Sequence, residues 1–274
     1  MKATREVLGA FDFKAEDMKV LYHSKNLLLH VQPLTLVAKV ASGVDQPGVD
    51  KNLELKVADH LHRAGVPCVV PSSIVPVEVH SRDGFQITFW DYFDEEKGRR
   101  AKHQDIPGLI RSLHEGLASF RYEGLPRFDA KLDVYLNGLA EGSDEMPGLP
   151  ESDRQFLFSI LAELKNNLSH DPAVVLGIIH GDCRPDNLLR NHAGAVKWID
   201  FEDTCFGPIA WDYGSFLDPG DDMLKAHART VEILSDIAHV CTAIRCWRKK
   251  ERKPPLQQAA ENYLRHLKQK FVSV

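Results

Sequence analysis

The sequence lacks any apolar run long enough to cross a membrane. Its longest aliphatic stretch is Ala173–Ile179, whereas a membrane-spanning helix needs about 20 apolar residues. The N-terminal residues Met1–Glu6 carry charges but no apolar segment follows them, as it would in a secretory signal. We therefore expect a cytoplasmic protein without a membrane partner.

Cysteine is also scarce. The 274 residues contain 5 cysteines, an odd number, and none of them stand in a Cys-x-x-Cys pair. The 13 histidines are scattered and form no His-Glu-x-x-His motif. This composition argues against a disulfide framework and against a zinc site.

A surplus of positive charge is missing as well. The formal net charge is −5, which argues against a protein built to hold nucleic acid. One basic run, Arg245–Lys253, is the exception. Such a run with a single aromatic residue is more typical of a solvated helix end than of a nucleic-acid-binding module.

The chemistry of the chain is concentrated between residues 174 and 215. One apolar run, Val174–Ile179, leads into Asp182, and a second, Val196–Ile199, leads directly into Asp200. Short apolar runs of this kind are typical of buried strands. We expect both carboxylates to converge with Asn187 on one point.

Two acids and an amide provide only oxygen ligands, which suit a hard cation such as Mg²⁺. One acid can remain free to hold a substrate hydroxyl. Phosphoryl transfer needs this equipment, because its catalysis consists mostly of positioning and electrostatic stabilisation. The sequence therefore points to a phosphotransferase.

The pattern His-Gly-Asp-x4-Asn at residues 180–187, followed by Ile-Asp-Phe-Glu-Asp at residues 199–203, resembles the aminoglycoside phosphotransferases and choline kinases. The resemblance implies an α+β, bilobal, protein-kinase-like fold. Residues 1–93 would form a small antiparallel sheet with one helix, and residues 94–274 a larger, mainly helical lobe. It also implies ATP or GTP as donor, Mg²⁺ as cofactor and a hydroxylated small molecule as acceptor.

The resemblance assigns roles in the catalytic segment. Asp182 would take the proton of the acceptor hydroxyl, and Asn187 and Asp200 would bind Mg²⁺. Arg184 stands where protein kinases place a lysine near the transferred phosphate. An arginine paired with Asp186 or exposed to solvent is an equally good interpretation.

Further nucleotide-binding residues follow from the same comparison. Lys39 matches the strand lysine that reaches the phosphates, and Glu54 is its candidate helix partner; an exposed lysine and a solvated acid are the alternatives. Ser24 and Asn26 lie in a turn that lacks glycine but resembles the phosphate-covering turn of the family. The hinge would comprise Phe89, Trp90, Asp91, Tyr92 and Phe93.

The acceptor site is predicted from charge placement. A series of acids follows the metal aspartate, and these acids could line a cleft that concentrates cations; they are Glu202, Asp203, Asp218, Asp221 and Asp222. A cationic amino alcohol or an aminoglycoside-like substrate would follow. The alternative is a turn and helix cap whose acids face water.

Other activities fit less well. A protein kinase needs a long activation segment, but only eleven residues separate Asp200 from Asp212. An inactive nucleotide-binding regulator would be expected to lack one of Lys39, Asp182, Asn187 or Asp200. All of them are present, although a regulator and a kinase for a non-cationic metabolite stay open as alternatives.

Overall fold

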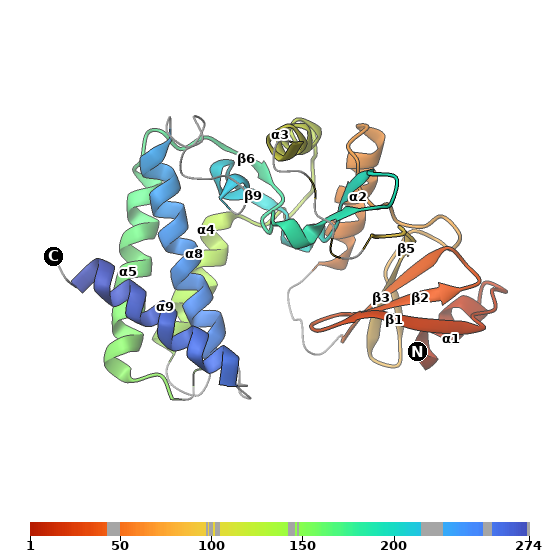
Figure 1. Cartoon of the computed structure of the whole chain (residues 1–274), viewed down its shortest axis with the longest axis horizontal. Helices are drawn as coiled ribbons and strands as arrows, with labels where there is room; N and C mark the ends of the chain where they lie inside the picture. The colour runs from red at the N-terminus through yellow and green to blue at the C-terminus, as the bar shows by residue number, and fades with distance from the viewer. Residues whose placement is uncertain are drawn as a thin grey trace. The chain divides into compact units, whose positions relative to one another are not determined.

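The computed structural model (Figure 1) describes residues 1–42, 50–96, 98, 101, 105–141, 146, 148–214, 227–248 and 254–272. Its N-terminal part contains a five-stranded sheet in the order β1-β2-β3-β5-β4. All neighbouring strands are antiparallel. The strands are β1 (Asp17–His23), β2 (Leu27–Gln32), β3 (Leu36–Ser42), β4 (His80–Arg82) and β5 (Phe85–Asp91).

The central strand β3 presents different chemistry on its two faces, because successive side chains of a strand alternate. Ala38 pairs with Leu29 and Phe89 in register, and these side chains belong to a core that helix α1 (Lys2–Gly9) completes. Lys39 points to the opposite face, where it meets Glu54 of helix α2 (Lys51–Arg63). The sheet is therefore apolar towards α1 and charged towards α2.

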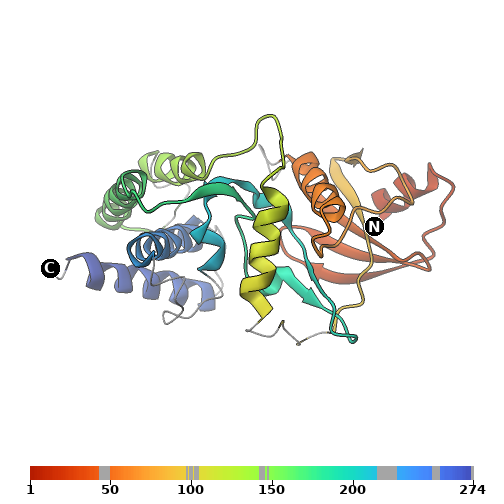
Figure 2. The same cartoon turned by 90° about the horizontal axis from the view of Figure 1, so that it is seen from above.

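Helix α2 starts at a side-chain cap, since the carboxylate of Asp50 accepts the N–H of Asn52 at 2.9 Å. Helix α3 (Ile106–Leu117) packs beside it, as two views show (Figures 1 and 2). A 2.9 Å contact between His60 Nε2 and the Gly116 carbonyl joins the two helices. The end of α2 that carries Glu54 is thus fixed by its own cap, and the other end by α3.

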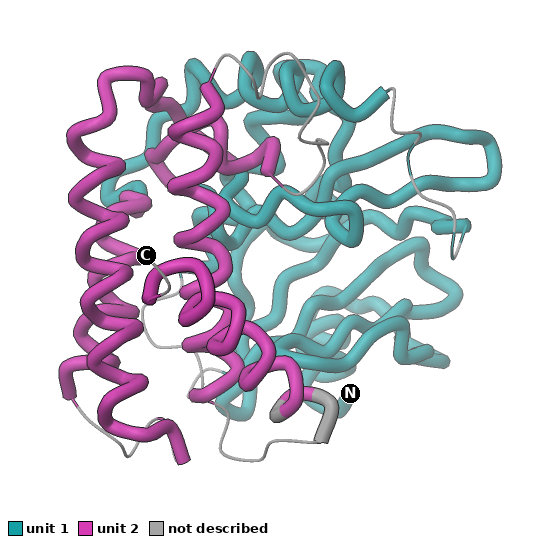
Figure 3. Tube along the Cα trace, turned by 60° about the vertical axis from the view of Figure 1, so that its left-hand side comes forward, with its two compact units in different colours: residues 1–125, 180–204 teal, residues 126–179, 205–274 magenta. Residues whose placement is uncertain are grey.

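The chain forms two compact units (Figure 3). One combines residues 1–125 with 180–204, and the other combines 126–179 with 205–274. The catalytic segment therefore packs with the sheet although 54 residues of the other unit, 126–179, precede it in the chain. The predicted lobe boundary at residue 93 stays a prediction.

The second part of the first unit is a hairpin flanked by two short 3-10 turns. Strands β7 (Leu188–Arg190) and β8 (Val196–Trp198) pair antiparallel. Residues 191–194, whose Asn-His-Ala-Gly sequence predicts a hairpin connection, form the turn between them, and the Asn191 side chain accepts the Ala195 N–H at 2.8 Å. Turn η3 (Pro185–Asn187) precedes the hairpin and η4 (Phe201–Asp203) follows it.

The second unit is mainly helical and is built around one core of buried Leu, Ile and Val side chains. Strands β6 (Leu176–Ile179) and β9 (Cys205–Pro208) pair antiparallel within it. Its helices are α4 (Phe128–Ala140), α5 (Glu151–Ser169), α6 (Ala210–Tyr213), α8 (Ala228–Arg248) and α9 (Pro254–Val272). None of the helices in the described part of the chain is long and apolar enough to cross a membrane.

Some local expectations were wrong. The apolar residues 74–79 predict a strand, but the structure has none there, because Pro76 cannot donate to a ladder. Residues 127–150 show no clear periodicity, yet helix α4 forms among them. Ser152 or Asp153 is predicted to cap the next helix, but α5 begins at Glu151 after Pro150. Strand β6 is half-exposed where a buried strand was expected.

Candidate active site

Lys39 lies at the centre of the charged cluster in the first unit. Its ammonium group donates to Glu54 Oε1 at 2.8 Å and to Asp200 Oδ1 at 2.7 Å. The Lys39 and Glu54 side chains are both buried. The alternatives of an exposed edge lysine and a solvated acid are therefore wrong for this pair.

The cluster shifts the protonation of its members. Burial alone would lower the pKa of Lys39, but the carboxylates of Glu54, Asp200 and Glu202 outweigh it and raise that pKa well above its ordinary value. Burial also raises the pKa of Glu54 against the opposing pull of Lys39. Lys39 therefore keeps its positive charge.

The catalytic loop is organised by a fully buried histidine. His180 Nε2 lies 3.0 Å from the Ile199 carbonyl, and its Nδ1 lies 3.4 Å from the Asp182 N–H. Donation from Nε2 and acceptance at Nδ1 require one neutral tautomer. His180 thus ties the backbone of Asp182 to the residue before Asp200.

Gly181 is required by the same loop. Its φ is +85°, and a Cβ atom at this position would lie 2.2 Å from the backbone oxygen of Asp203. Any side chain would force the loop away from the segment that follows Asp200. The close approach brings Asp182 and Asp203 into one electrostatic environment.

Asn187 lies between Asp182 and the strand end that precedes Asp200. Its Nδ2 group donates to the Asp182 carbonyl at 2.8 Å and to Asp182 Oδ2 at 3.0 Å. The backbone carbonyl of Asn187 accepts the Ile199 N–H at 3.0 Å. Asp182, Asn187 and Ile199, the residue before Asp200, are thus linked by short hydrogen bonds.

Asp182 has the environment of a tuned carboxylate. Burial raises its pKa, the guanidinium of Arg184 opposes the rise, and Asp203 adds to it. Arg184 Nε lies 3.1 Å from Asp182 Oδ2, while half of the arginine side chain remains exposed. Arg184 therefore contacts the predicted base directly.

The oxygen set fits a hard cation. Asp200 adopts a left-handed conformation, with φ 67° and ψ 59°, which Asp tolerates better than most residues. The Asn187 amide nitrogen donates to Asp182, so its side-chain oxygen is the atom that a metal would meet. No cluster of three His, Cys, Asp or Glu within the described residues could hold a metal, so a cation here would depend on this amide, on Asp200 and on ligands from a nucleotide.

Glu202 lies in a lysine cluster. Its carboxylate is 2.7 Å from Lys51 Nζ, 2.9 Å from Lys25 Nζ and 3.5 Å from Lys39 Nζ. Burial would raise the pKa of Glu202, but these ammonium groups hold it far below its ordinary value. A carboxylate neutralised in this way contributes little to the attraction of a cationic acceptor.

Two residues of the predicted hinge use their backbone N–H groups in hydrogen bonds within the fold. Asp91 and Tyr92 donate their N–H groups to the Val70 and Thr35 carbonyls, both at 3.0 Å. Phe89 and Trp90 are buried on β5. Glu95 donates its N–H to the Phe93 carbonyl at 2.9 Å.

The predicted phosphate turn and acceptor acids are only partly described. Ser24 donates its N–H to the Asn26 carbonyl at 3.1 Å, which closes a tight turn between β1 and β2. Asp203 lies beside the catalytic loop. Asp218, Asp221 and Asp222 lie outside the described residues.

Lys25 and Lys51 were not predicted as site residues. Lys51 carried a usable signal, because a lysine at the first position of a helix lies at the positive end of the helix dipole, where acids are preferred. Its burial there demands an anionic partner. Lys25 carried no comparable signal, since its partner Glu202 is 177 residues away.

Sequence comparison decides the family. The family model described as APH, phosphotransferase enzyme family, matches residues 22–269. The chain belongs to this phosphotransferase family. The match includes Lys39, Glu54, Asp182, Asn187 and Asp200, which are the residues that the structure gathers in its first unit.

A distant relative is the homoserine kinase of Pseudomonas aeruginosa. It is 27% identical over 177 residues, which cover 61% of this chain and 52% of the relative. The match therefore spans about half the length of that protein.

Solved structures show the same fold. An aminopropanol kinase associated with microcompartments superposes with a TM-score of 0.71 at 17% identity, covering 99% of this chain and 98% of that one. The GDP complex of aminoglycoside 2'-phosphotransferase-IIIa gives 0.69 at 18% identity, covering 97% of each chain. An amicoumacin kinase with AMP-PNP and Ca²⁺ gives 0.69 at 12% identity, covering 97% and 93%. The predicted kinase-like α+β fold is confirmed.

Proposed function

We propose that this phosphotransferase transfers the γ-phosphate of ATP or GTP to a hydroxyl group of a small molecule. The observation that carries the proposal is the position of Lys39, whose ammonium lies between Glu54 and Asp200 at 2.8 and 2.7 Å. A buried cation placed beside a metal-binding carboxylate is suited to hold a polyphosphate. Asp182 adds the acceptor side of the reaction.

Each residue has a separate task. Lys39 binds the phosphates, and Glu54 keeps the lysine pointed at them. Phe93 offers its N–H to the base from the hinge, while Ser24 and Asn26 shape the turn that covers the phosphates. Asp182 receives the proton of the attacking hydroxyl, which its raised pKa favours.

Asn187 and Asp200 would hold Mg²⁺ through oxygen atoms. When bound, the ion neutralises charge that develops on the transferred phosphoryl group. Arg184 lies two residues after Asp182 and is half-exposed. Its guanidinium can leave Asp182 for the phosphoryl oxygens at little cost, because exposed ion pairs contribute little stability.

We infer that the acceptor is an amino alcohol or a related cation. Asp203 supports this inference, since its carboxylate shares the environment of Asp182. The names of two similar proteins, an aminopropanol kinase and a homoserine kinase, also denote acceptors that carry both a hydroxyl and an amino group. Asp218, Asp221 and Asp222 would extend the acidic surface.

An assay that measures the release of the nucleoside diphosphate, ADP or GDP, tests the proposal. The purified chain is incubated with ATP or GTP and a library of hydroxylated compounds that includes amino alcohols, aminoglycosides, sugars and neutral alcohols. We expect turnover that EDTA abolishes and added Mg²⁺ restores, with cationic acceptors preferred. A chain that binds nucleotide but turns over nothing would support the regulator instead, and a neutral best substrate would overturn the acceptor class alone.

A further inference from the structure

Three lysines from different elements converge on one carboxylate, that of Glu202. Lys25 belongs to the turn between β1 and β2, Lys39 to β3, and Lys51 is the first residue of α2. Lys25 contacts Oε1, and Lys51 and Lys39 contact Oε2. Glu202 follows the predicted metal ligand Asp200 by two positions.

The three lysines differ in their exposure and in the carboxylates that they contact. Lys51 is 3% exposed, and within the described residues Glu202 is the one carboxylate at ion-pair distance from it. Lys39 shares its charge with Glu54 and Asp200. Lys51 therefore anchors Glu202, since a buried ammonium at the positive end of a helix needs this partner.

Lys25 is the lysine that can most easily separate from Glu202. Its side chain is 53% exposed, and its only ion pair among the described residues is with Glu202 at 2.9 Å. An exposed pair of this kind is easily exchanged for a stronger partner. Separation from Glu202 leaves that carboxylate still bonded to Lys51.

Lys25 and Lys39 contact different oxygens of the same carboxylate. A carboxylate and a phosphate present similar oxygen atoms to an ammonium group. A phosphate held by Lys39 therefore lies within reach of Lys25 after a rotation of its flexible side chain. The turn that carries Lys25 also contains Ser24 and Asn26, the residues predicted to cover the phosphates.

We propose that Lys25 is a phosphate-binding residue of the nucleotide site, held by Glu202 in the absence of nucleotide and transferred to the terminal phosphates when a nucleoside triphosphate binds. This inference rests on the proposed function. It distinguishes Lys25, which changes partner, from Lys51, which keeps Glu202 in place.

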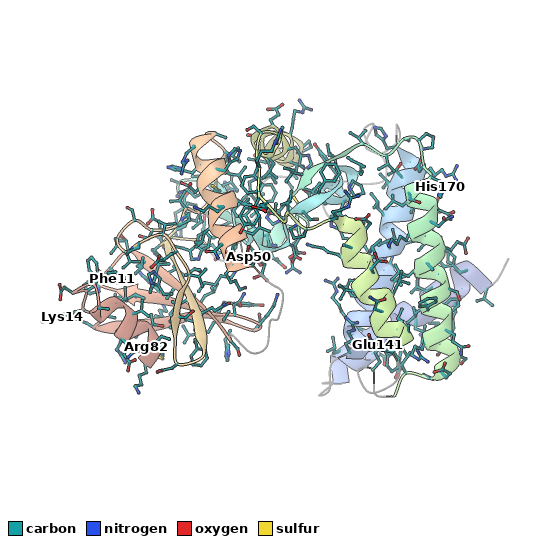
Figure 4. The ribbon with its side chains drawn as sticks, turned by 180° about the vertical axis from the view of Figure 1, so that it is seen from behind. Phe11, Lys14, Asp50, Arg82, Glu141 and His170 are labelled. Atoms are coloured by element: carbon teal, nitrogen blue, oxygen red, sulfur yellow. The ribbon has the colours of Figure 1, made fainter. Side chains whose placement is uncertain are left out.

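Calorimetry with Mg²⁺ and AMP-PNP, ADP or AMP tests the proposal on the intact chain. Lys25→Ala should weaken AMP-PNP binding by about 10-fold, the effect of one lost charge-assisted contact, with a smaller effect on ADP and none on AMP. Lys25→Arg should restore most of the affinity. Lys14→Ala is the matched control, because this exposed lysine lies beside Phe11 and away from Asp50 at the start of α2 (Figure 4).

The outcomes separate the two proposals. Unchanged AMP-PNP affinity in Lys25→Ala, while the wild type binds normally, would overturn the role of Lys25 and leave the proposed function intact. Equal losses for all three nucleotides with a lowered Tm would reduce Lys25 to a structural latch. A wild-type chain that binds no nucleotide would overturn both.

Discussion

Lys39 and Glu54 form a buried ion pair of 2.8 Å that joins the central strand of the sheet to α2. The pair orients an ammonium that also contacts Asp200, so each partner depends on the position of the other. The variants below test this arrangement and its surroundings.

Lys39→Met should lower kcat/KM by about 10²-fold to 10³-fold, because a preorganised donor to the phosphates is lost. Steady-state kinetics with varied nucleotide measures the loss. Lys56→Met is the control, since Lys56 is an exposed lysine on α2. Equal kinetics for the two variants would remove Lys39 from the nucleotide site.

Asp182→Asn should lower kcat by about 10²-fold to 10⁴-fold while nucleotide affinity changes little, since the carboxylate serves the acceptor. Single-turnover rates and calorimetry separate the two quantities. Asp186→Asn, in the same loop but exposed, should be nearly silent. A loss confined to nucleotide binding would contradict the assigned role of Asp182.

The pH dependence should respond to Arg184. Burial raises the pKa of Asp182 and Arg184 lowers it, so Arg184→Ala should raise that pKa further. Because the ionised carboxylate accepts the proton, the acidic limb of the kcat/KM profile should move to higher pH. The exposed Arg63→Ala should leave the limb in place, and a limb that moved to lower pH in Arg184→Ala would be incompatible with this contact.

Glu202→Gln should destabilise the fold by about 3–5 kcal/mol at neutral pH, the usual cost of leaving a buried lysine unpaired. The folded pKa of Glu202 lies below its ordinary value. Its stabilisation is therefore present above the unfolded pKa of about 4.3 and is lost as pH falls below it. Denaturant unfolding at several pH values measures the difference in unfolding free energy between the wild type and Glu202→Gln, with the exposed Glu123→Gln as control. A difference that persists in acid would point to packing instead.

The residues gathered around Asp182 could be identified in the sequence because most of them are near neighbours in the chain. His180, Asp182 and Asn187 fall within eight residues, and Asp200 follows one hairpin later. Lys39 could be recognised because a charge inside an apolar strand is unusual. Patterns of such short range can be recognised in a sequence without knowledge of the fold.

The lysine cluster could not be predicted in the same way. Glu202 meets Lys51 and Lys25 over separations of 151 and 177 residues, and no periodicity connects such positions. Glu202 was interpreted by its charge as part of an acceptor surface, whereas its neighbours are cations. The missing strand at residues 74–79 had a local cause, Pro76, which apolar composition concealed.

The first unit is discontinuous, since residues 1–125 pack with residues 180–204. During synthesis the sheet and α2 emerge from the ribosome long before the carboxylates of Asp200 and Glu202. Until then, Lys51 lacks the partner that its burial requires, and Lys39 has Glu54 but not Asp200. The first unit can therefore be completed only after about three quarters of the chain has been made, and a gene fragment that ends at residue 125 would encode an incomplete fold.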